Sequence, residues 1–451
     1  MNRFAWIAAL CCSAAVWGQD AYPDDGRELE PPSRVARLSY LDGTVSFQPA
    51  GTADWVAAQL NRPLTTGDRL YTESGSRAEL HTGSTAFRVA PRTGVNIDQL
   101  DDRIIRLIVT EGTVSFRVKR LDSGEIVEVD TPNAAVQVDR PGEYRVNVAG
   151  PTRSEAVVLA GEVTVNQQPV GFRQAVLMNG PQGDLDQGPP PPRDGFDQWV
   201  EARDRAEDRS LSARYVPAGT IGYEDLDANG TWVDVPPYGM VWQPRVVAAG
   251  WAPYRFGHWV FIEPWGWTWV DDAPWGFAPF HYGRWAYARG GWCWVPGPAA
   301  VRAVYAPALV SFHVGGAGWG VSVSSGAPVS WVPLAPGEVW APGFRATHAY
   351  WNRINVNNTV IQNRTVINNY YVAVHNNNTQ VIQNVNYVNR AAPGGMTTVP
   401  RETFARAARV QHAMIATPPA PAPAAFRQQA QAPPPPARQG ASPAAPARMQ
   451  A

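Results

Sequence analysis

The stretch Ala252-Pro253-Tyr254-Arg255-Phe256-Gly257 returns 26 residues later as Ala278-Pro279-Phe280-His281-Tyr282-Gly283. A tryptophan stands two positions after each final glycine, and a Trp-x-Trp-Val sequence follows after a short interval. An earlier copy with fewer matching residues runs from Gly230 to Pro244. Because a period near 26 residues has room for two strands and their turns, each copy is predicted to form one β-hairpin.

Tryptophan is concentrated in this repeated block. The 451-residue chain has 19 tryptophans, and fifteen of them lie between Trp232 and Trp351. Residues two apart on a strand share a face, so Trp265, Trp267 and Trp269 are predicted to form one aromatic stripe. Trp292 and Trp294 are predicted to form another.

Two interpretations of these stripes remain open. The rings can fill a core, since each buried aromatic removes roughly 150–250 Å² from water and the block has no disulfide to stabilise it. Alternatively, an exposed stripe can bind a sugar or peptide polymer, because large exposed apolar patches usually mark binding surfaces. The candidate ligand-binding residues for the second interpretation are Trp265, Trp267, Trp269, Trp275, His281, Tyr282, Trp285, Trp292 and Trp294.

Catalytic and metal chemistry have few candidates in this block. Asp271 and Asp272 are paired carboxylates that could hydrolyse a glycan together with Glu263, but Asp-Asp-Ala-Pro is also typical of a hairpin turn. His258 and His281 have no third metal ligand at a recognisable spacing. Cys293 between two tryptophans is typical of a packed thiol. The sequence therefore predicts no enzyme, metal or cofactor, with a glycan hydrolase as a minor alternative.

Residues 35–180 show short alternating runs of apolar and polar residues, separated by turn signals such as Asp42-Gly43 and Gly67-Asp68. A spacing of about 8 to 12 residues between turns favours an antiparallel β-domain. The expected fold class is therefore mainly β, with two different β-domains.

Ordered motifs in this first region resemble the periplasmic domain of the FecR family. The motifs are Gly43-Thr44-Val45, Leu64 to Leu70, Glu111-Gly112, Val129 to Ala134, Gly142 to Val146 and Gly161 to Val165. The resemblance implies an all-β periplasmic module, which in some members relays a signal from an outer-membrane transporter to a sigma factor. Only the module is carried over, because no internal membrane helix is apparent here.

The Trp-rich block, residues 220–345, resembles the tryptophan-rich domain DUF6600, which commonly follows a FecR-like module in bacterial envelope proteins. The resemblance rests on Gly222 to Leu226, Tyr238 to Trp242, Trp275 to Trp285, Trp294 to Gly297 and Trp331 to Leu334. It implies no activity, since that family has none assigned.

Residues 1–18 are typical of a secretory signal peptide. Arg3 precedes an apolar run from Phe4 to Val16, which is shorter than the ~20 residues that span a bilayer. Cys11 and Cys12 leave lipidation open as a second possibility. Export to the periplasm or the outer membrane of a bacterium is therefore expected, and Cys293 remains as the one cysteine after cleavage.

The remaining segments differ sharply in composition. Residues 186–217 predict a Pro-rich linker and a charged helix docked by its Phe-Trp end. Residues 352–389 hold 13 Asn and are predicted to be β-prone, either as an extended segment or as assembling amide ladders. Residues 400–416 predict one helix, and residues 417–451 a disordered Pro/Ala-rich tail.

The overall composition narrows the function. A formal net charge of −1 with 17% charged residues disfavours nucleic acid as a partner. The leading hypothesis is a non-catalytic cell-envelope protein that binds or scaffolds an envelope polymer or protein. The alternative is a periplasmic regulator or signal-relay component that acts through the FecR-like domain.

Overall fold

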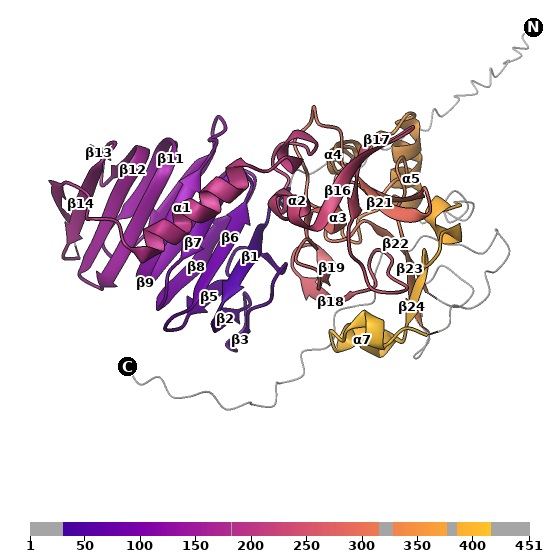
Figure 1. The fold of residues 1–451 in the computed structure, drawn as a ribbon, viewed down its shortest axis with the longest axis horizontal. Coiled ribbons are helices and arrows are strands. Elements are labelled where there is room, and N and C mark those ends of the chain that lie inside the picture. The colour runs from indigo at the N-terminus through magenta and orange to yellow at the C-terminus, as the bar shows by residue number, and fades with distance from the viewer. Residues whose placement is uncertain (1–29, 182, 315–327, 377–385, 416–451) are drawn as a thin grey trace, which may run out of the picture.

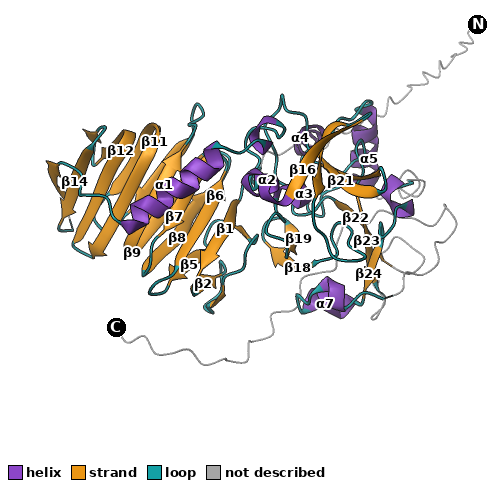
Figure 2. Cartoon of the chain, viewed as in Figure 1, coloured by secondary structure: helices purple, strands orange, loops and turns teal. Residues whose placement is uncertain are grey.

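The computed structural model describes residues 30–181, 183–314, 328–376 and 386–415. It is mainly β, as predicted, with few and short helices (Figure 2). Two units lie side by side: an N-terminal β-unit, residues 36–188, and a Trp-rich unit, residues 216–415 (Figure 1). The predicted signal peptide and tail lie outside the described residues.

The N-terminal β-unit is one 15-stranded sheet that encloses an aliphatic core. Its long strand β9 pairs with β8 and β10 along its first half and with β7 and β11 along its second half. The strands are β1 (Ala36–Asp42), β2 (Val45–Gln48), β3 (Val56–Ala57), β4 (Pro63–Leu64), β5 (Arg69–Thr72), β6 (Arg77–Thr82), β7 (Thr85–Val89), β8 (Thr93–Leu100), β9 (Ile104–Val118), β10 (Ile126–Asp130), β11 (Ala135–Gly150), β12 (Arg153–Val165), β13 (Gln168–Val170), β14 (Gln174–Asn179) and β15 (Asp184–Gly188).

Helix α1 (Gly195–Asp208) lies across one face of this sheet (Figure 1). Asp194 begins it with a capping box, in which its side chain accepts from the backbone of Asp197. The predicted docking by the Phe-Trp end alone is wrong. Asp204 and Glu207, in the helix's C-terminal half, also pair with sheet arginine and lysine side chains.

The Trp-rich unit contains the three predicted hairpins. The first two pair β16 (Gly230–Val235) with β17 (Gly239–Pro244) and β18 (Gly257–Ile262) with β19 (Gly266–Asp271). The third pairs β20 (Arg284–Ala288) with β21 (Gly291–Val295). In each hairpin one tryptophan stands directly opposite another, and these pairs are Trp232 with Trp242, Trp259 with Trp269, and Trp285 with Trp294.

The glycine two positions before the first tryptophan of each hairpin lies against the ring of the opposite tryptophan. A Cβ atom at Gly230 would lie 2.2 Å from the Trp242 ring, and one at Gly257 would lie 2.7 Å from the Trp269 ring. At Gly283 it would lie 2.6 Å from Trp294 Nε1. The Gly-to-Trp spacing of the repeat therefore records a close contact between backbone and indole.

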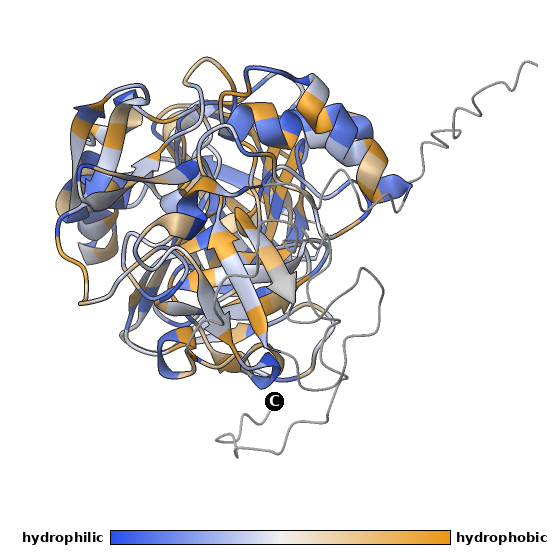
Figure 3. Ribbon diagram, turned by 90° about the vertical axis from the view of Figure 1, so that its right-hand side faces the viewer, coloured by the Kyte–Doolittle hydropathy of each residue, from blue (hydrophilic) through white to orange (hydrophobic). Residues whose placement is uncertain are grey.

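Further elements surround the hairpins. A three-stranded sheet consists of β22 (Val310–Val314), β23 (Val329–Pro333) and β24 (Thr397–Val399). The helices are α2 (Leu226–Asn229), α3 (Ala278–His281), α4 (His348–Asn358), α5 (Thr365–His375) and α7 (Arg401–Ala405), with 3₁₀ turns η1 (Ser212–Arg214), η2 (Tyr223–Asp225), η3 (Val388–Ala391) and η4 (Val410–His412). Viewed end-on, hydrophobic residues mark the central strands, and outer helices alternate hydrophobic with hydrophilic residues (Figure 3).

The Asn-rich segment 352–389 differs from its β-prone prediction. Helices α4 and α5 occupy residues 348–358 and 365–375, and residues 377–385 lie outside the described residues. Asn355 and Asn358 face the core and form hydrogen bonds with backbone groups of other segments. These tertiary contacts outweigh the β propensity of the segment. The predicted helix over residues 400–416 is also shorter, because α7 ends before Ala407, whose φ is +47°.

Candidate functional site

The nine residues proposed as a binding stripe are buried. Their exposed fractions run from 0% to 7%, with Trp292 the largest. Trp265 lies in the turn before β19 and not on the strand. The prediction of an exposed binding stripe is therefore wrong, and the structure shows that these residues fill a core.

Ring contacts explain why the stripe is covered. Trp259 is the centre of the cluster, with ring centroids of Trp269, Phe312, Trp331 and Phe404 at 4.9 to 5.4 Å. These partners come from two different sheets and from α7, and the rings of all three hairpins belong to one aromatic core. Edge-to-face and stacked pairs at this separation are favourable beyond the area they bury.

Indole N–H groups are also used inside the core. Trp242 donates to Leu226 O at 3.0 Å, Trp294 to Tyr282 O at 2.8 Å, and Trp331 to Tyr254 O at 3.0 Å. Among the described tryptophans of the block, Trp232 and Trp251 are only half-buried. Trp269 Nε1 donates to the Asp271 carboxylate, whereas Nε1 of Trp259, Trp265 and Trp285 is buried without a hydrogen-bond partner within the residues that the structure describes.

The paired carboxylates of the hydrolase alternative have different surroundings. Asp271 is buried, and its carboxylate accepts from Trp269 Nε1 and from the backbone of Ala273. Burial raises the pKa of Asp271 to about 7. Asp272 is exposed and pairs with Arg409. Asp271 ends β19 and Asp272 begins the following turn, so one carboxylate is buried and the other exposed.

Glu263 is exposed, whereas His258, His281 and Cys293 are packed in the interior. Burial lowers the pKa of His258 to about 4 and that of His281 to about 3, and His281 Nδ1 lies 2.8 Å from Ala306 O. Burial raises the pKa of Cys293 to about 11, and its thiol donates to Ala286 O. Within the described residues no group of three possible metal ligands occurs.

A cluster of buried charges joins the two units instead. Arg37, on β1, is fully buried and its guanidinium lies 3.0 Å from Glu224 Oε1 and 2.5 Å from Asp225 Oδ2. Its Nη2 also donates to Pro274 O, and its Nε to Asn61 Oδ1. One side chain of the N-terminal β-unit therefore contacts two separate turns of the Trp-rich unit.

Asn61 reinforces this contact from the loop before β4. Its amide donates to Asp271 O at 3.1 Å and to Ala273 O at 2.6 Å. Its φ of +63° is left-handed, a conformation that asparagine adopts more readily than most residues. The Asp271–Pro274 turn is thus a contact point between units, and its role in the structure is docking.

His81, on β6, is a further member of the buried charges between the units and lies between two carboxylates. Its Nε2 lies 3.2 Å from Glu79 Oε1 and its Nδ1 lies 3.1 Å from Glu224 Oε1. Burial alone would lower the pKa of His81, but the charges of Glu224 and Glu79 outweigh it and raise this pKa to about 10. His81 is therefore a cation at neutral pH.

Glu79 connects these buried charges to helix α1. Arg203 donates to both of its carboxylate oxygens at 2.7 and 3.0 Å, and Arg88 donates to Oε2 at 2.9 Å. Burial opposes ionisation of Glu79, yet the neighbouring cations hold its pKa well below its usual value. We call the inter-unit ion cluster the set Arg37, Glu79, His81, Arg88, Arg203, Glu224 and Asp225.

Sequence reasoning missed this cluster for a clear reason. On β1 and β6, the charged residues alternate with core residues such as Leu38 and Leu80, so they read as a solvent face. That face is instead covered by α1 and η2. The one available signal was the acidic pair Glu224-Asp225, which lies inside a motif quoted for the family resemblance.

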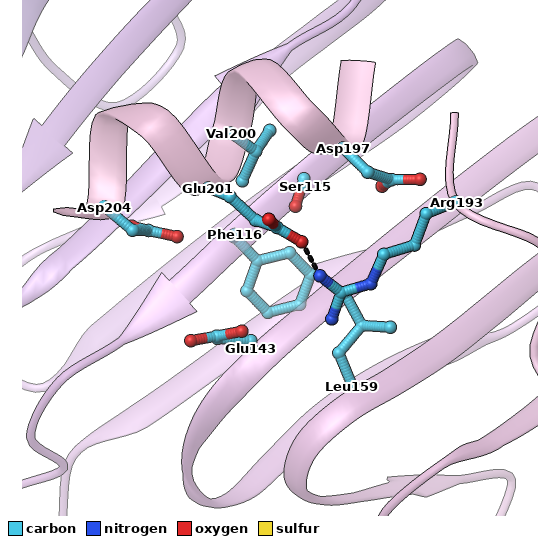
Figure 4. Close-up of a pocket in the computed structure, with 9 residues that line it drawn as sticks. All are labelled: Ser115, Phe116, Glu143, Leu159, Arg193, Asp197, Val200, Glu201 and Asp204. Atoms are coloured by element: carbon cyan, nitrogen blue, oxygen red, sulfur yellow. Dashed lines mark ion pairs between the residues drawn. The ribbon is translucent and has the colours of Figure 1, made fainter. Parts of the chain in front are cut away.

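A cavity of about 230 Å³ also lies between the units. Its lining includes Arg34 and Asp102 from the first unit's side and Arg302 and Arg353 from the second. A second pocket beneath α1 has room for at most one water, at about 10 Å³. Arg193 and Glu201 form an ion pair across its edge (Figure 4).

The helices in the described part of the chain are too short or too polar to cross a bilayer.

Comparisons with known proteins match parts of the chain. The search of curated proteins found no match. Two crystal structures of a candidate anti-sigma factor from Parabacteroides distasonis ATCC 8503 are similar at 18% and 17% identity, with TM-scores of 0.23 and 0.25. They cover 27% and 29% of this chain, which spans 59% and 64% of theirs. Residues 223–338 match the model described as a family of unknown function, DUF6600.

Proposed function

We propose that this chain is a non-catalytic scaffold of the bacterial cell envelope, in which the two units are fixed in one orientation to present a surface to an envelope polymer or protein. The inter-unit ion cluster carries this proposal. The proposal needs no catalytic group, and it does not use the buried tryptophans as a contact surface.

Buried charges fix the orientation of the two units more than they add to stability. A buried ion pair gains little net stability over apolar packing, because both partners lose hydration. Leaving one partner unpaired is costly, however, so an arrangement of buried charges penalises every alternative alignment. Sliding one unit on the other would separate Arg37 and His81 from Glu224 while all three stay shielded from water.

Helix α1 supports the same conclusion. It pairs with the sheet through Arg203 and Glu79, and Glu207 in its last turn accepts from the Tyr223 hydroxyl at 3.2 Å. The segment between the units is therefore bonded at both ends. A flexible linker would leave such groups in water, whereas a scaffold requires this kind of fixed joint.

Distance measurements between spin labels test the fixed orientation. With Cys11 and Cys12 replaced by serine, the buried Cys293 stays unlabelled, and Gln187→Cys with Asp234→Cys adds one exposed label to each unit. We expect one narrow distance distribution for the full chain. A broad or multimodal distribution would overturn the scaffold proposal.

A matched pair of variants assigns the rigidity to the cluster. Glu224→Gln removes the shared carboxylate of Arg37 and His81 and is expected to broaden the distribution. Glu162→Gln makes the same change at the exposed pair with Arg140 and is expected to leave it unchanged. Equal distributions in both variants would show that the cluster does not set the orientation.

The cellular part of the proposal has its own test. Fractionation of a bacterium that expresses the full chain is expected to place it in the envelope. Co-sedimentation with peptidoglycan sacculi examines a polymer partner, and cross-linking in cells examines a protein partner. Recovery in the cytosolic fraction, or recovery free of both partners, would contradict the proposed role.

A further inference from the structure

The 230 Å³ cavity between the units borders the aromatic core, whose Ile221 and Tyr282 form part of its lining. Bulk water occupies about 30 Å³ per molecule, so the space exceeds what one or two ordered waters fill. Both units contribute its walls: Arg34, Gly83 and Asp102 on one side, and Gly219 and Arg302 on the other. Arg353, on α4, completes the lining of charged side chains.

Each of its three arginines is held by a carboxylate that does not line the cavity. Arg34 Nη1 lies 2.6 Å from Glu125, and Arg353 Nη2 lies 3.0 Å from Glu30. Arg302 Nη1 pairs with Asp122. Arg34 Nη2 also donates to Asp102 O at 3.1 Å. The anchors fix the guanidinium groups, and the Nε atoms of Arg34 and Arg353 and Nη2 of Arg302 remain as donors.

Two of the remaining donors lie close to Gly83, where there is no side chain. Arg34 Nε and Arg302 Nη2 each lie 3.9 Å from the position that a Cβ atom would take at Gly83, so these two nitrogens are at most 7.8 Å apart. Arg353 Nε is buried and has no hydrogen-bond partner. A buried donor without a partner is costly, and an acceptor in the cavity would satisfy it.

The side chains that line the cavity offer an anion more donors than acceptors, although the carboxylates behind the three arginines balance their charge. Three arginines face a single carboxylate, Asp102, and one of its oxygens already accepts from the backbone of Ser33 at 2.7 Å. Guanidinium groups recognise carboxylate and phosphate through paired N–H donors, and such charge-assisted bonds are the strong ones.

We propose that this cavity binds a small oxyanion, a carboxylate or a phosphate, through Arg34 of the first unit's side and Arg302 and Arg353 of the second. Because both units supply donors, the bound anion joins them. The proposal goes beyond the scaffold role, since a rigid joint does not require a ligand and a ligand site does not require an envelope partner.

Titration calorimetry and thermal unfolding of the full chain test this site with inorganic phosphate and with succinate as separate arms. Sodium chloride at matched ionic strength is the control for screening. We expect saturable binding and a rising unfolding midpoint for at least one oxyanion, and the stronger arm identifies phosphate or carboxylate as its chemistry. Equal midpoints in oxyanion and chloride, with no heat of binding, would overturn the proposal.

Three variants locate the site. Arg302→Gln and Arg353→Gln change half-exposed side chains, so both variants should fold. Each is expected to raise the dissociation constant by about tenfold or more. Asp102→Asn removes the opposing charge and is expected to tighten binding. Arg140→Gln, at a side chain 71% exposed and outside the lining, should leave affinity unchanged. Unaltered affinity in both arginine variants would place any binding elsewhere.

Discussion

The two units of this chain have different interiors. The N-terminal β-unit has strands of up to 16 residues and a core dominated by valine, leucine and isoleucine. The Trp-rich unit has strands of five or six residues in its hairpins, divided among small sheets, and an aromatic core. Large rings thus compensate for short hydrogen-bonded ladders, and few residues carry much of that core.

The largest expected effect follows from this concentration. Trp259→Ala removes the ring that contacts four others and is expected to lower the free energy of unfolding of the Trp-rich unit by about 3–5 kcal/mol. Chemical denaturation followed by tryptophan fluorescence measures it. Trp55→Ala, at a side chain 48% exposed in the other unit, should change stability by about 0.5 kcal/mol or less. Similar losses in both variants would remove the contrast.

The joint between the units should be nearly as sensitive. Glu224→Gln leaves Arg37 and His81 buried without their shared anion, and a loss of about 3 kcal/mol is expected. Differential scanning calorimetry should then resolve two transitions where the native chain gives one. Glu162→Gln is the exposed control, and a single unchanged transition in Glu224→Gln would contradict the prediction.

The pH dependence of the joint follows from His81. Its pKa is raised to about 10, from about 6.5 in an unfolded chain, by Glu224 and Glu79, with the cations Arg37, Arg88 and Arg203 packed around them. The stabilising contribution is complete below about pH 6.5 and declines as the pH rises toward 10, by at most about 1.4 kcal/mol per pH unit.

Unfolding titrations at pH 7, 8 and 9 measure this slope. His81→Gln cannot take up the proton, so its stability should vary less with pH than that of the native chain. A native stability that is constant or rises between pH 7 and pH 9 would show that His81 is not held as a cation.

The smallest effect concerns the Asn-rich helices. Asn355 accepts from Trp340 N at 2.7 Å and donates to Trp340 O at 2.9 Å, so Asn355→Ala leaves buried backbone groups without partners. A loss of about 1–3 kcal/mol is expected by thermal or chemical unfolding. Asn368→Ala, at an exposed position of α5, should cost less than half as much. Equal losses would mean that helix propensity dominates this segment.

Local patterns predicted the local structure well. The repeated glycine and the tryptophan 11 or 12 positions after it identified three hairpins, because the ring of that tryptophan lies against the glycine. Alternation of apolar and polar residues identified the strand-rich region that holds β1 and β6, and the apolar residues Leu38 and Leu80 of these strands lie in the core.

Covering elements were harder to predict than strands. Whether Trp267 or His81 meets water depends on α7, α1 and η2, which are distant in the chain. The Asn-rich helices were missed because Asn355 and Asn358 stabilise a helix only through partners such as Trp340 and Val304. Sequence patterns report which residues share a face, and long-range contacts decide what lies against it.

The Asp271–Pro274 turn also affects whether the Trp-rich unit can exist apart from the N-terminal β-unit. Three of its backbone carbonyls, those of Asp271, Ala273 and Pro274, point to donors on another unit. A unit excised at residue 216 would carry three unmet acceptors beside the anions Glu224 and Asp225. Wherever such a unit occurs without this neighbour, water or the donors of another partner must satisfy these acceptors.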